Sequence, residues 1–553
     1  MGCDSSATMC AEKSSGNGMP TPYETPIGSW TRPTTFFWAA TGATFGLANV
    51  WQFPYLAGQH GGGLFILLYL ACLLLVTLPL MVTESAMGRY ARHGLVLAMD
   101  GFVRSARRSR AWMWAGRLGV LAAFLVLSFT AVFGAIALAY VFYGAMGRFI
   151  GAGEAEAAGI LSTLVSDSRD YRVFMGWHGF FLLLVVWVSM QGVVDGVERA
   201  VRVVAPAMML ILLALCGLAA WSGDFRSASD FMLDFRPADV TLDSLRAALF
   251  HAFFTLGLGM GVWTLFGAYT PADTRLKRSV LAVVLMDTLI AIGAGLAIYS
   301  LAPDGHSMEG ERGFGLLFLS LPVALADLPG SQFLVAAVFL VIVMIVWTTS
   351  LSLLEPVVGW FQEWTGAPRG LSAFLMGGSV WLAGLGSLLS FNLWSDERFA
   401  GGTLFRWLEL ITGGFLIPLV SILISVFAGW YLTRNLTFTI LGKAPRLIGR
   451  IWFWVMRLIL PLVVAYIGLQ YTATSLVALC NSGSNGLWCE PSAELAPSSM
   501  TPAAPDPDDI NNEADDADRG GNTEARPGEE SGKNGPARQE SDPNSGDILY
   551  HSV

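Results

Sequence analysis

The sequence predicts an all-α protein that crosses a membrane many times, and three observations support this fold class. Only 14% of the 553 residues are charged, whereas about 25% is usual in soluble domains. Apolar runs of about 20 residues, each long enough to cross a bilayer, recur about eleven times between Phe36 and Leu479. Two of these runs, the first and the sixth, contain helix-breaking residues near their middles.

The first run, from about Phe36 to Leu56, is interrupted by Gly42, Gly46 and Pro54 and also carries the polar Asn49. A helix in lipid cannot leave backbone groups unpaired, so a break is tolerated only where it lines a protein cavity or holds an ion. This run therefore predicts a discontinuous transmembrane helix that builds a binding site.

The sixth run, about 245–269, carries four glycines: Gly257, Gly259, Gly261 and Gly267. Glycines alone often serve close helix packing in membranes. Broken helices at matching places in two halves of five helices, however, are typical of transporters built from an inverted repeat. Because the first run is also interrupted, we predict a 5+5 inverted repeat with discontinuous helices 1 and 6.

The remaining spans and the loops between them predict how the chain is oriented. The other spans are expected at about 64–87, 120–146, 174–193, 206–221, 280–301, 333–360, 373–390, 407–431 and 451–479. Lys and Arg gather in the loops after the second, sixth and tenth spans, and such loops face the cytoplasm. The N-terminus is then cytoplasmic. We expect a disordered segment at 1–29, a transmembrane domain at 30–479, and a disordered acidic tail at 480–553 on the outer side.

The motif GLANVWQFPY at 46–55, followed by three glycines at 61–63, resembles the signature of the neurotransmitter:sodium symporter family. The likeness continues through 79–89, 196–206, 254–259, 315–322 and 348–356 and covers about 30–479. An eleven-span form without a twelfth helix is similar to the bacterial branch. The resemblance implies a LeuT-type fold, two sodium ions as cofactors, and a bacterial inner membrane as the location.

Carried over by matching position, the resemblance implies two sodium sites whose ligands are all oxygens, as a hard cation requires. The first would use Thr44, Asn49, Thr255 and Asp287. The second would use the carbonyls of Gly42, Phe45 and Ile345 and the hydroxyls of Thr348 and Thr349. A lone acid inside a span, such as Asp287, is a functional candidate by default, although a buried structural hydrogen bond is the alternative. Relatives that need chloride have a neutral residue there, so the acid suggests chloride-independent transport.

The same resemblance implies a substrate pocket between the first, third, sixth and eighth spans. Its predicted residues are Ala43, Gly46, Thr130, Phe254, Gly257, Met260 and Leu353. Gly46 stands where monoamine carriers use an Asp, which leaves room for a substrate carboxylate and favours an amino acid. Aromatic and aliphatic walls suit a hydrophobic side chain. Thr130 stands where most members have a Tyr that donates to that carboxylate.

Gate positions also depart from the family pattern. At the outer gate, Gln52 replaces the usual Arg, Glu409 holds the acidic position, and Arg406 lies one helical turn earlier as a substitute cation or an ordinary surface partner. At the inner gate, Trp30 and Glu363 match, but the usual Arg before the Trp is absent and Arg32 follows instead.

Other functional classes are weaker on the sequence. The six His residues are scattered and no paired nucleophile accompanies the membrane acids, so an enzyme is not expected. The net charge of −9 arises from acids that pool in the tail, which gives no sign of a nucleic-acid partner. The expected partners are a small solute and the lipid bilayer, and the oligomeric state is left open. A transport-inactive sensor, a channel and a carrier of another solute remain alternatives.

Overall fold

The computed structural model describes residues 27–301, 315–395, 397, 402–432 and 446–481. Within these ranges the chain is helical apart from turns, connecting segments and one isolated bridge between Gly62 and Phe235. The predictions for residues 1–26 and for the tail beyond 481 fall outside the described residues. The disordered segments expected at either end of the chain therefore stay predictions.

Nine helical segments of the described chain are long and apolar enough to cross a membrane. They are Gly63–Ala91 (α3 Gly63–Cys72, η1 Leu73–Thr77, α4 Leu78–Ala91), Arg110–Ala145 (η2 Arg110–Trp112, α6 Met113–Ala145), Tyr171–Met190 (α8), Val193–Ser222 (η3 Val193–Glu198, α9 Arg199–Ser222), Leu276–Leu301 (α13), Ser331–Thr365 (α15), Arg369–Leu389 (α16), Leu404–Tyr431 (α17 Leu404–Glu409, η7 Leu410–Leu416, α18 Ile417–Val426, η8 Phe427–Tyr431) and Gly449–Val477 (in α20 Arg446–Trp454, η9 Val455–Ile459, α21 Leu460–Asn481).

The first and sixth spans are each divided into two short helices. The first consists of α1 (Thr35–Thr44) and α2 (Ala48–Gln59), and the sixth of α11 (Leu242–Thr255) and α12 (Val262–Tyr269). None of the four halves exceeds 14 residues, which is too short to cross a bilayer alone. The predicted all-α membrane fold with discontinuous helices 1 and 6 is confirmed, whereas the exact count of eleven spans stays a prediction.

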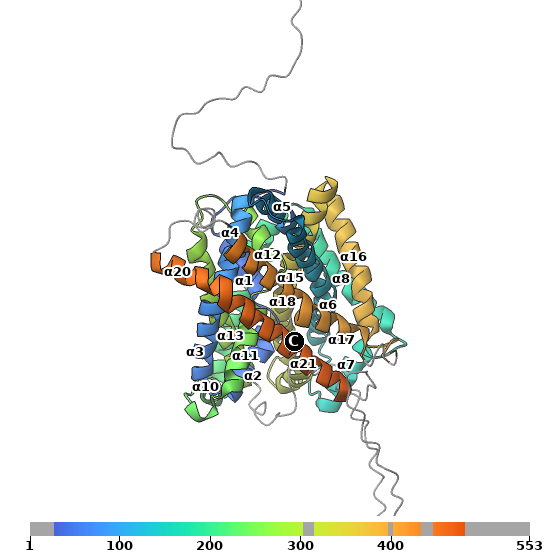
Figure 1. Ribbon diagram of the computed structural model, residues 1–553. Coiled ribbons are helices and arrows are strands. Elements are labelled where there is room, and N and C mark those ends of the chain that lie inside the picture. Colours follow the sequence, from blue (N-terminus) through green and yellow to red (C-terminus); the bar gives the residue numbers. More distant parts are fainter. Residues whose placement is uncertain (1–26, 302–314, 396, 398–401, 433–445, 482–553) are drawn as a thin grey trace, which may run out of the picture.

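The helices form one bundle around a continuous apolar core (Figure 1). The two longest, α6 and α15, pack along each other, and α4 packs against α12. That second contact depends on small residues: a Cβ at Gly88 or at Gly267 would overlap the carbonyl oxygen of Thr264 or of Ser85. The last helices, α20 and α21, cross the front of the bundle in Figure 1.

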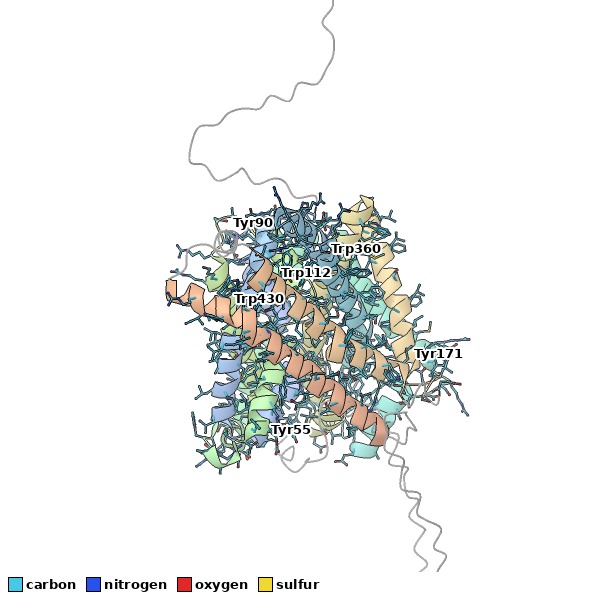
Figure 2. The ribbon with its side chains drawn as sticks, viewed as in Figure 1. Tyr55, Tyr90, Trp112, Tyr171, Trp360 and Trp430 are labelled. Atoms are coloured by element: carbon cyan, nitrogen blue, oxygen red, sulfur yellow. The ribbon has the colours of Figure 1, made fainter. Side chains whose placement is uncertain are left out.

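Loops from distant parts of the chain meet at the two ends of the bundle. Near α5 (Leu95–Ser105), the Arg92 guanidinium donates to the carbonyls of Ala268 and Thr270, which joins the arginine-rich loop to the end of α12. The opposite end carries the short elements α7 (Glu154–Val165), α10 (Phe225–Leu233), η4 (Pro237–Asp239), η6 (Leu316–Ser320) and α14 (Leu321–Ala326). Figure 2 shows Tyr90 and Trp360 toward the first end and Tyr55 and Tyr171 toward the second, as aromatic residues at membrane interfaces are arranged.

Candidate functional site

The break in the first span is three residues long. α1 ends at Thr44, Phe45 leaves the helical conformation with φ −72° and ψ 87°, and α2 begins at Ala48. Gly46 lies in the break, where a Cβ would approach only the carbonyl oxygen of Thr44, at 3.9 Å. The backbone between the two halves is therefore open on the side that Gly46 faces.

The break in the sixth span is longer, and two side chains form hydrogen bonds with its backbone. Gly257, Gly259 and Gly261 all have φ between +57° and +77°, a region that residues with a Cβ rarely adopt. The N–H of Gly259 donates to the buried carboxylate of Glu84 at 3.0 Å, and the Trp263 indole donates to the carbonyl of Leu256 at 2.7 Å. These contacts satisfy backbone groups that an intact helix would have paired.

The four residues of the first predicted sodium site lie together around Asp287. Its fully buried carboxylate accepts hydrogen bonds from the Asn49 amide at 2.7 Å and, more distantly, from the hydroxyls of Tyr69 at 3.3 Å and Thr255 at 3.4 Å. Thr255 also donates to the side-chain oxygen of Asn49 at 2.8 Å. Thr44, buried at the end of α1, lies beside Asp287 and borders the same cavity as Asn49 and Thr255.

The Asp287 carboxylate lacks a cationic side-chain partner among the residues that the structure describes. Within the described ranges, no Lys, Arg or His forms a salt bridge with it. A buried charge is unfavourable unless it is paired, and several oxygens around one acid are the ligand set of a hard cation. The residues present therefore fit a sodium ion that arrives as cargo.

The five residues of the second predicted sodium site also lie together, between α1 and α15. The Thr349 hydroxyl lies 3.5 Å from the carbonyl oxygens of both Gly42 and Phe45. The Thr348 hydroxyl donates to the Ile345 carbonyl at 3.0 Å. The approach is close, because a Cβ at Gly42 would lie 3.0 Å from the Cβ of Thr348.

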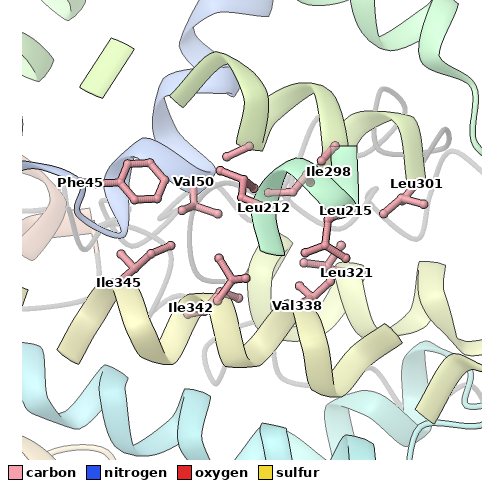
Figure 3. A pocket seen from close by; sticks show the side chains of 13 residues that line it. Phe45, Val50, Leu212, Leu215, Ile298, Leu301, Leu321, Val338, Ile342 and Ile345 are labelled. Atoms are coloured by element: carbon pink, nitrogen blue, oxygen red, sulfur yellow. The ribbon is translucent and has the colours of Figure 1, made fainter. Parts of the chain in front are cut away.

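Apolar packing fixes the two backbone segments that supply these carbonyls. The side chains of Phe45 and Ile345 enter a small cavity of about 30 Å³ lined only by apolar residues of α2, α9, α13, α14 and α15 (Figure 3). Val50 reaches the same end of that cavity from α2. The side chains of these residues are thus anchored in apolar surroundings, whereas the carbonyl oxygen of Phe45 faces Thr349.

Both helix breaks border one central cavity of about 190 Å³. It is lined by all seven residues predicted for the substrate: Ala43, Gly46, Thr130, Phe254, Gly257, Met260 and Leu353. Thr44, Asn49, Thr255 and Thr349 also border it, so the two ion clusters open onto the same space. The arrangement can hold a small solute beside cations.

Two of the predicted outer-gate residues, Gln52 and Glu409, border this cavity, and Arg406 lies close to Glu409 in the chain. Gln52 lies 3.4 Å from Nδ1 of His251, and the buried Glu409 accepts from the Tyr471 hydroxyl at 3.1 Å. Arg406 is half-buried one turn before Glu409 on α17. Gln52 and Glu409 both line the cavity.

The predicted inner-gate residues are held by different neighbours. The backbone N–H of Trp30 donates to the backbone carbonyl of Tyr269 at 2.8 Å. Glu363 accepts from the N–H of Gly94 at 2.9 Å and lies 3.1 Å from Nδ1 of His93. In the described part of the chain, no hydrogen bond connects Trp30 with Glu363.

Comparison with known proteins identifies the family. The sequence model of the Sodium:neurotransmitter symporter family matches residues 28–148 and 172–472. The chain belongs to this family. A sodium-dependent transporter of Bacillus subtilis (strain 168), YhdH, is 30% identical over 449 residues, which are 80% of this chain and 97% of that protein. The human sodium- and chloride-dependent GABA transporter 2 is 25% identical over 364 residues, 58% of this chain and 59% of that one.

A solved structure shows the same fold as this symporter-family chain. The crystal structure of MhsT in complex with L-phenylalanine matches it with a TM-score of 0.70 and 27% identity, over 80% of this chain and 99% of that one. The protein is thus a sodium-dependent transporter with a LeuT-type fold, and its family consists of transporters rather than enzymes.

Several residues of this symporter's cavity were not predicted from the sequence. Tyr471 enters from α21 and stacks on Phe250 with ring centroids 5.4 Å apart. Phe129, Phe133 and Phe405 add further aromatic walls. The signal that could have found them is weak, because aromatic residues in apolar spans face lipid, helix or cavity with equal ease.

Proposed function

We propose that the protein is a secondary active symporter that imports an apolar amino acid together with sodium ions by alternating access. One observation carries the proposal: both helix breaks open onto a single cavity whose lining combines oxygen-bearing residues of the two ion clusters with aromatic side chains. The charged amino and carboxyl groups of such a substrate suit the oxygen-bearing residues, and its apolar side chain suits the aromatic ones. The relative MhsT has been crystallised with L-phenylalanine, which supports the same substrate class.

The substrate carboxylate would lie against the start of α2. The first N–H groups of a helix have no partner within it, and the helix dipole favours a negative charge there. Gly46, just before α2, leaves this place free of side-chain atoms. The cation beside Asn49 would complete the counter-charge, so that ion and substrate favour each other's binding.

We propose two sodium sites and no requirement for chloride. Two separate oxygen clusters border the cavity, one around Asp287 and one between α1 and α15. The fixed charge of Asp287 would take the role that an anion has in chloride-dependent relatives. The GABA transporter that resembles this chain is named as chloride-dependent.

We also propose that the N-terminus faces the cytoplasm of a bacterial inner membrane. The arginine-rich end near α5 supports this orientation. An alkaline phosphatase reporter fused after Arg107, in the loop that follows α5, should be inactive, whereas a fusion after Gly153, before α7, should be active. The reverse pattern would contradict the proposed orientation.

A transport-inactive sensor is the second candidate, and the outer end of the cavity favours it. Gln52, which is uncharged, stands at the gate position where the family pattern has an Arg, and its side-chain oxygen lies 3.4 Å from Nδ1 of His251. A carrier whose outer gate closes weakly could bind ligand without completing turnover.

A thermal-shift screen on purified protein tests the first proposal. L-Phenylalanine and other apolar amino acids should raise the unfolding temperature in sodium and leave it unchanged in N-methylglucamine. Equal stabilisation in both cations would contradict sodium coupling, and stabilisation by none would contradict the substrate class. Uptake into proteoliposomes then separates the candidates, because a sensor binds in sodium without flux.

A further inference from the structure

The segment that precedes α1, residues 28–35, is here called the entry segment, and one side of it is fastened to α12. The Trp30 N–H donates to the Tyr269 carbonyl at 2.8 Å. The buried Trp30 ring packs against Phe266 and Tyr269, with ring centroids 5.3 and 5.5 Å away. This side is held chiefly by apolar packing.

The other side of the entry segment is held by a single carboxylate, that of Glu198. Its Oε2 accepts from the Thr31 N–H at 2.8 Å. Its Oε1 accepts from the hydroxyls of Thr31 at 2.9 Å and Thr35 at 2.7 Å. Hydrogen bonds to a charged acceptor are roughly twice as strong as neutral ones, and Glu198 is only 2% exposed.

Local backbone geometry directs Glu198 toward the entry segment. It is the last residue of η3, a π-helical turn that follows Gly192, whose φ is +108°. Val193 at the start of the same turn packs against Gly28, where a Cβ would lie 3.1 Å from its methyl group. η3 therefore contacts the entry segment at both ends.

The position of the entry segment is transmitted to the second ion cluster. α1 begins at Thr35, which Glu198 holds, and it ends at the Gly42 and Phe45 carbonyls that face Thr349. An α-helix of 10 residues moves as a rigid rod, so displacement of its first turn displaces its last. Within the described residues, the inner-gate acid Glu363 forms no hydrogen bond with the entry segment and is engaged with Gly94 and His93 instead.

We propose that Glu198 is the latch that keeps α1 closed over the second sodium ion, and that its release from Thr31 and Thr35 opens the ion's path to the cytoplasm. Glu198 is thus a positioning residue that acts through α1. The proposal rests on the proposed sodium-coupled cycle.

The same turn offers a matched control. Asp195 lies on η3 beside the same cavity of about 280 Å³ as Glu198. It is 73% exposed and pairs with Arg199 at 3.2 Å, and no contact joins it to the entry segment in the described structure. Asp195→Ala removes an equal charge from the same element.

Hydrogen exchange measured by mass spectrometry on the full chain tests the latch without requiring transport. In sodium, Glu198→Ala should speed exchange of the Trp30 and Thr31 amides about tenfold or more, and it should weaken sodium-dependent thermal stabilisation. Asp195→Ala should leave both unchanged. If the amides of Glu198→Ala exchanged at the wild-type rate, the latch proposal would be overturned. If exchange were faster as expected but the wild-type protein showed no sodium-dependent flux, only the proposed function would be overturned.

A second variant separates direct contact from general loosening and serves also if Glu198→Ala fails to fold. Thr35→Val removes one hydroxyl at nearly constant volume and should speed the same exchange severalfold. In the double variant, Thr35→Val should have little effect beyond that of Glu198→Ala, because the hydrogen bond between Thr35 and Glu198 is already lost. Additive effects of the two substitutions, or no effect of Thr35→Val alone, would contradict the proposal.

Discussion

The Asp287 carboxylate accepts three hydrogen bonds and forms no salt bridge with a cationic side chain of the described chain. We predict that Asp287→Asn lowers sodium-driven uptake at least tenfold in chloride-free buffer, because the cation then enters a buried site without a counter-charge. Chloride should restore part of the uptake by supplying that charge.

Uptake into proteoliposomes with chloride or gluconate as the anion measures this effect. Asp243→Asn is the control, since Asp243 is 71% exposed and pairs with Arg246, and it should behave as wild type. Wild-type protein that itself requires chloride would show that Asp287 does not replace the anion.

Gly46 decides how much of the cavity is open beside the helix break. A Cβ at this position meets only the Thr44 carbonyl, at 3.9 Å, so a side chain fits the fold but projects into the binding space. We predict that Gly46→Leu keeps the unfolding temperature of the ligand-free protein within a few degrees and loses sodium-dependent stabilisation by L-phenylalanine.

The thermal-shift assay measures both quantities on the same sample. Gly101→Leu serves as control, because nothing lies within 4 Å of a Cβ there and no residue of α5 lines the cavity. Retained ligand response in Gly46→Leu would show that the substrate binds elsewhere.

At the scale of elements, the broken sixth span depends on a group from another helix. Glu84 on α4 accepts the Gly259 N–H that the interruption frees. We predict that Glu84→Ala destabilises the protein by about 1–3 kcal/mol, the usual cost of leaving a buried donor unpaired. Glu84→Gln keeps an acceptor oxygen and should be much milder.

Thermal unfolding of both variants in sodium tests whether Glu84→Ala is more destabilising than Glu84→Gln. Glu154→Ala, an exposed acid in the first turn of α7, controls for loss of charge. If Glu84→Gln were as damaging as Glu84→Ala, the negative charge rather than the hydrogen bond would be what the broken helix requires.

The helix breaks could be predicted from sequence because their cause is local. Gly257, Gly259 and Gly261 adopt positive φ, which marks them as breakers whatever surrounds them. Side-chain partners depend on how helices rotate against each other, which an apolar run does not specify. The entry of Tyr471 into the cavity and the contact between Glu198 and Thr31 therefore emerged only from the structure.

The roles of the gate residues show the same limit. Gln52 and Glu409 were matched by position and do border the cavity. Trp30 and Glu363 were matched in the same way, yet their hydrogen-bond partners are Tyr269 for one and Gly94 and His93 for the other. Position in a motif predicted where these side chains lie and left their partners undetermined, since the partners come from a helix end and a loop that lie far away in the sequence.

In the proposed symport, the whole molecule converts an ion gradient into solute accumulation, and the voltage dependence of that accumulation gives the number of ions transported. Each charge that crosses gains about 2.3 kcal/mol per 100 mV, and about 1.4 kcal/mol corresponds to a tenfold ratio. With a neutral zwitterion as substrate, one sodium ion gives about a 50-fold change in accumulation per 100 mV, and two give about 2,000-fold. We predict the steeper dependence, because both oxygen clusters border the cavity.

Potassium diffusion potentials across proteoliposomes set the voltage, and accumulation of labelled L-phenylalanine at the plateau gives the ratio. Thr349→Val removes the hydroxyl that faces the Gly42 and Phe45 carbonyls and should reduce the dependence to about that of one ion. Thr77→Val is the control, because the Thr77 hydroxyl donates to the Leu73 carbonyl of its own span and Thr77 does not line the cavity. A wild-type dependence near 50-fold would mean that only one cluster carries a transported ion.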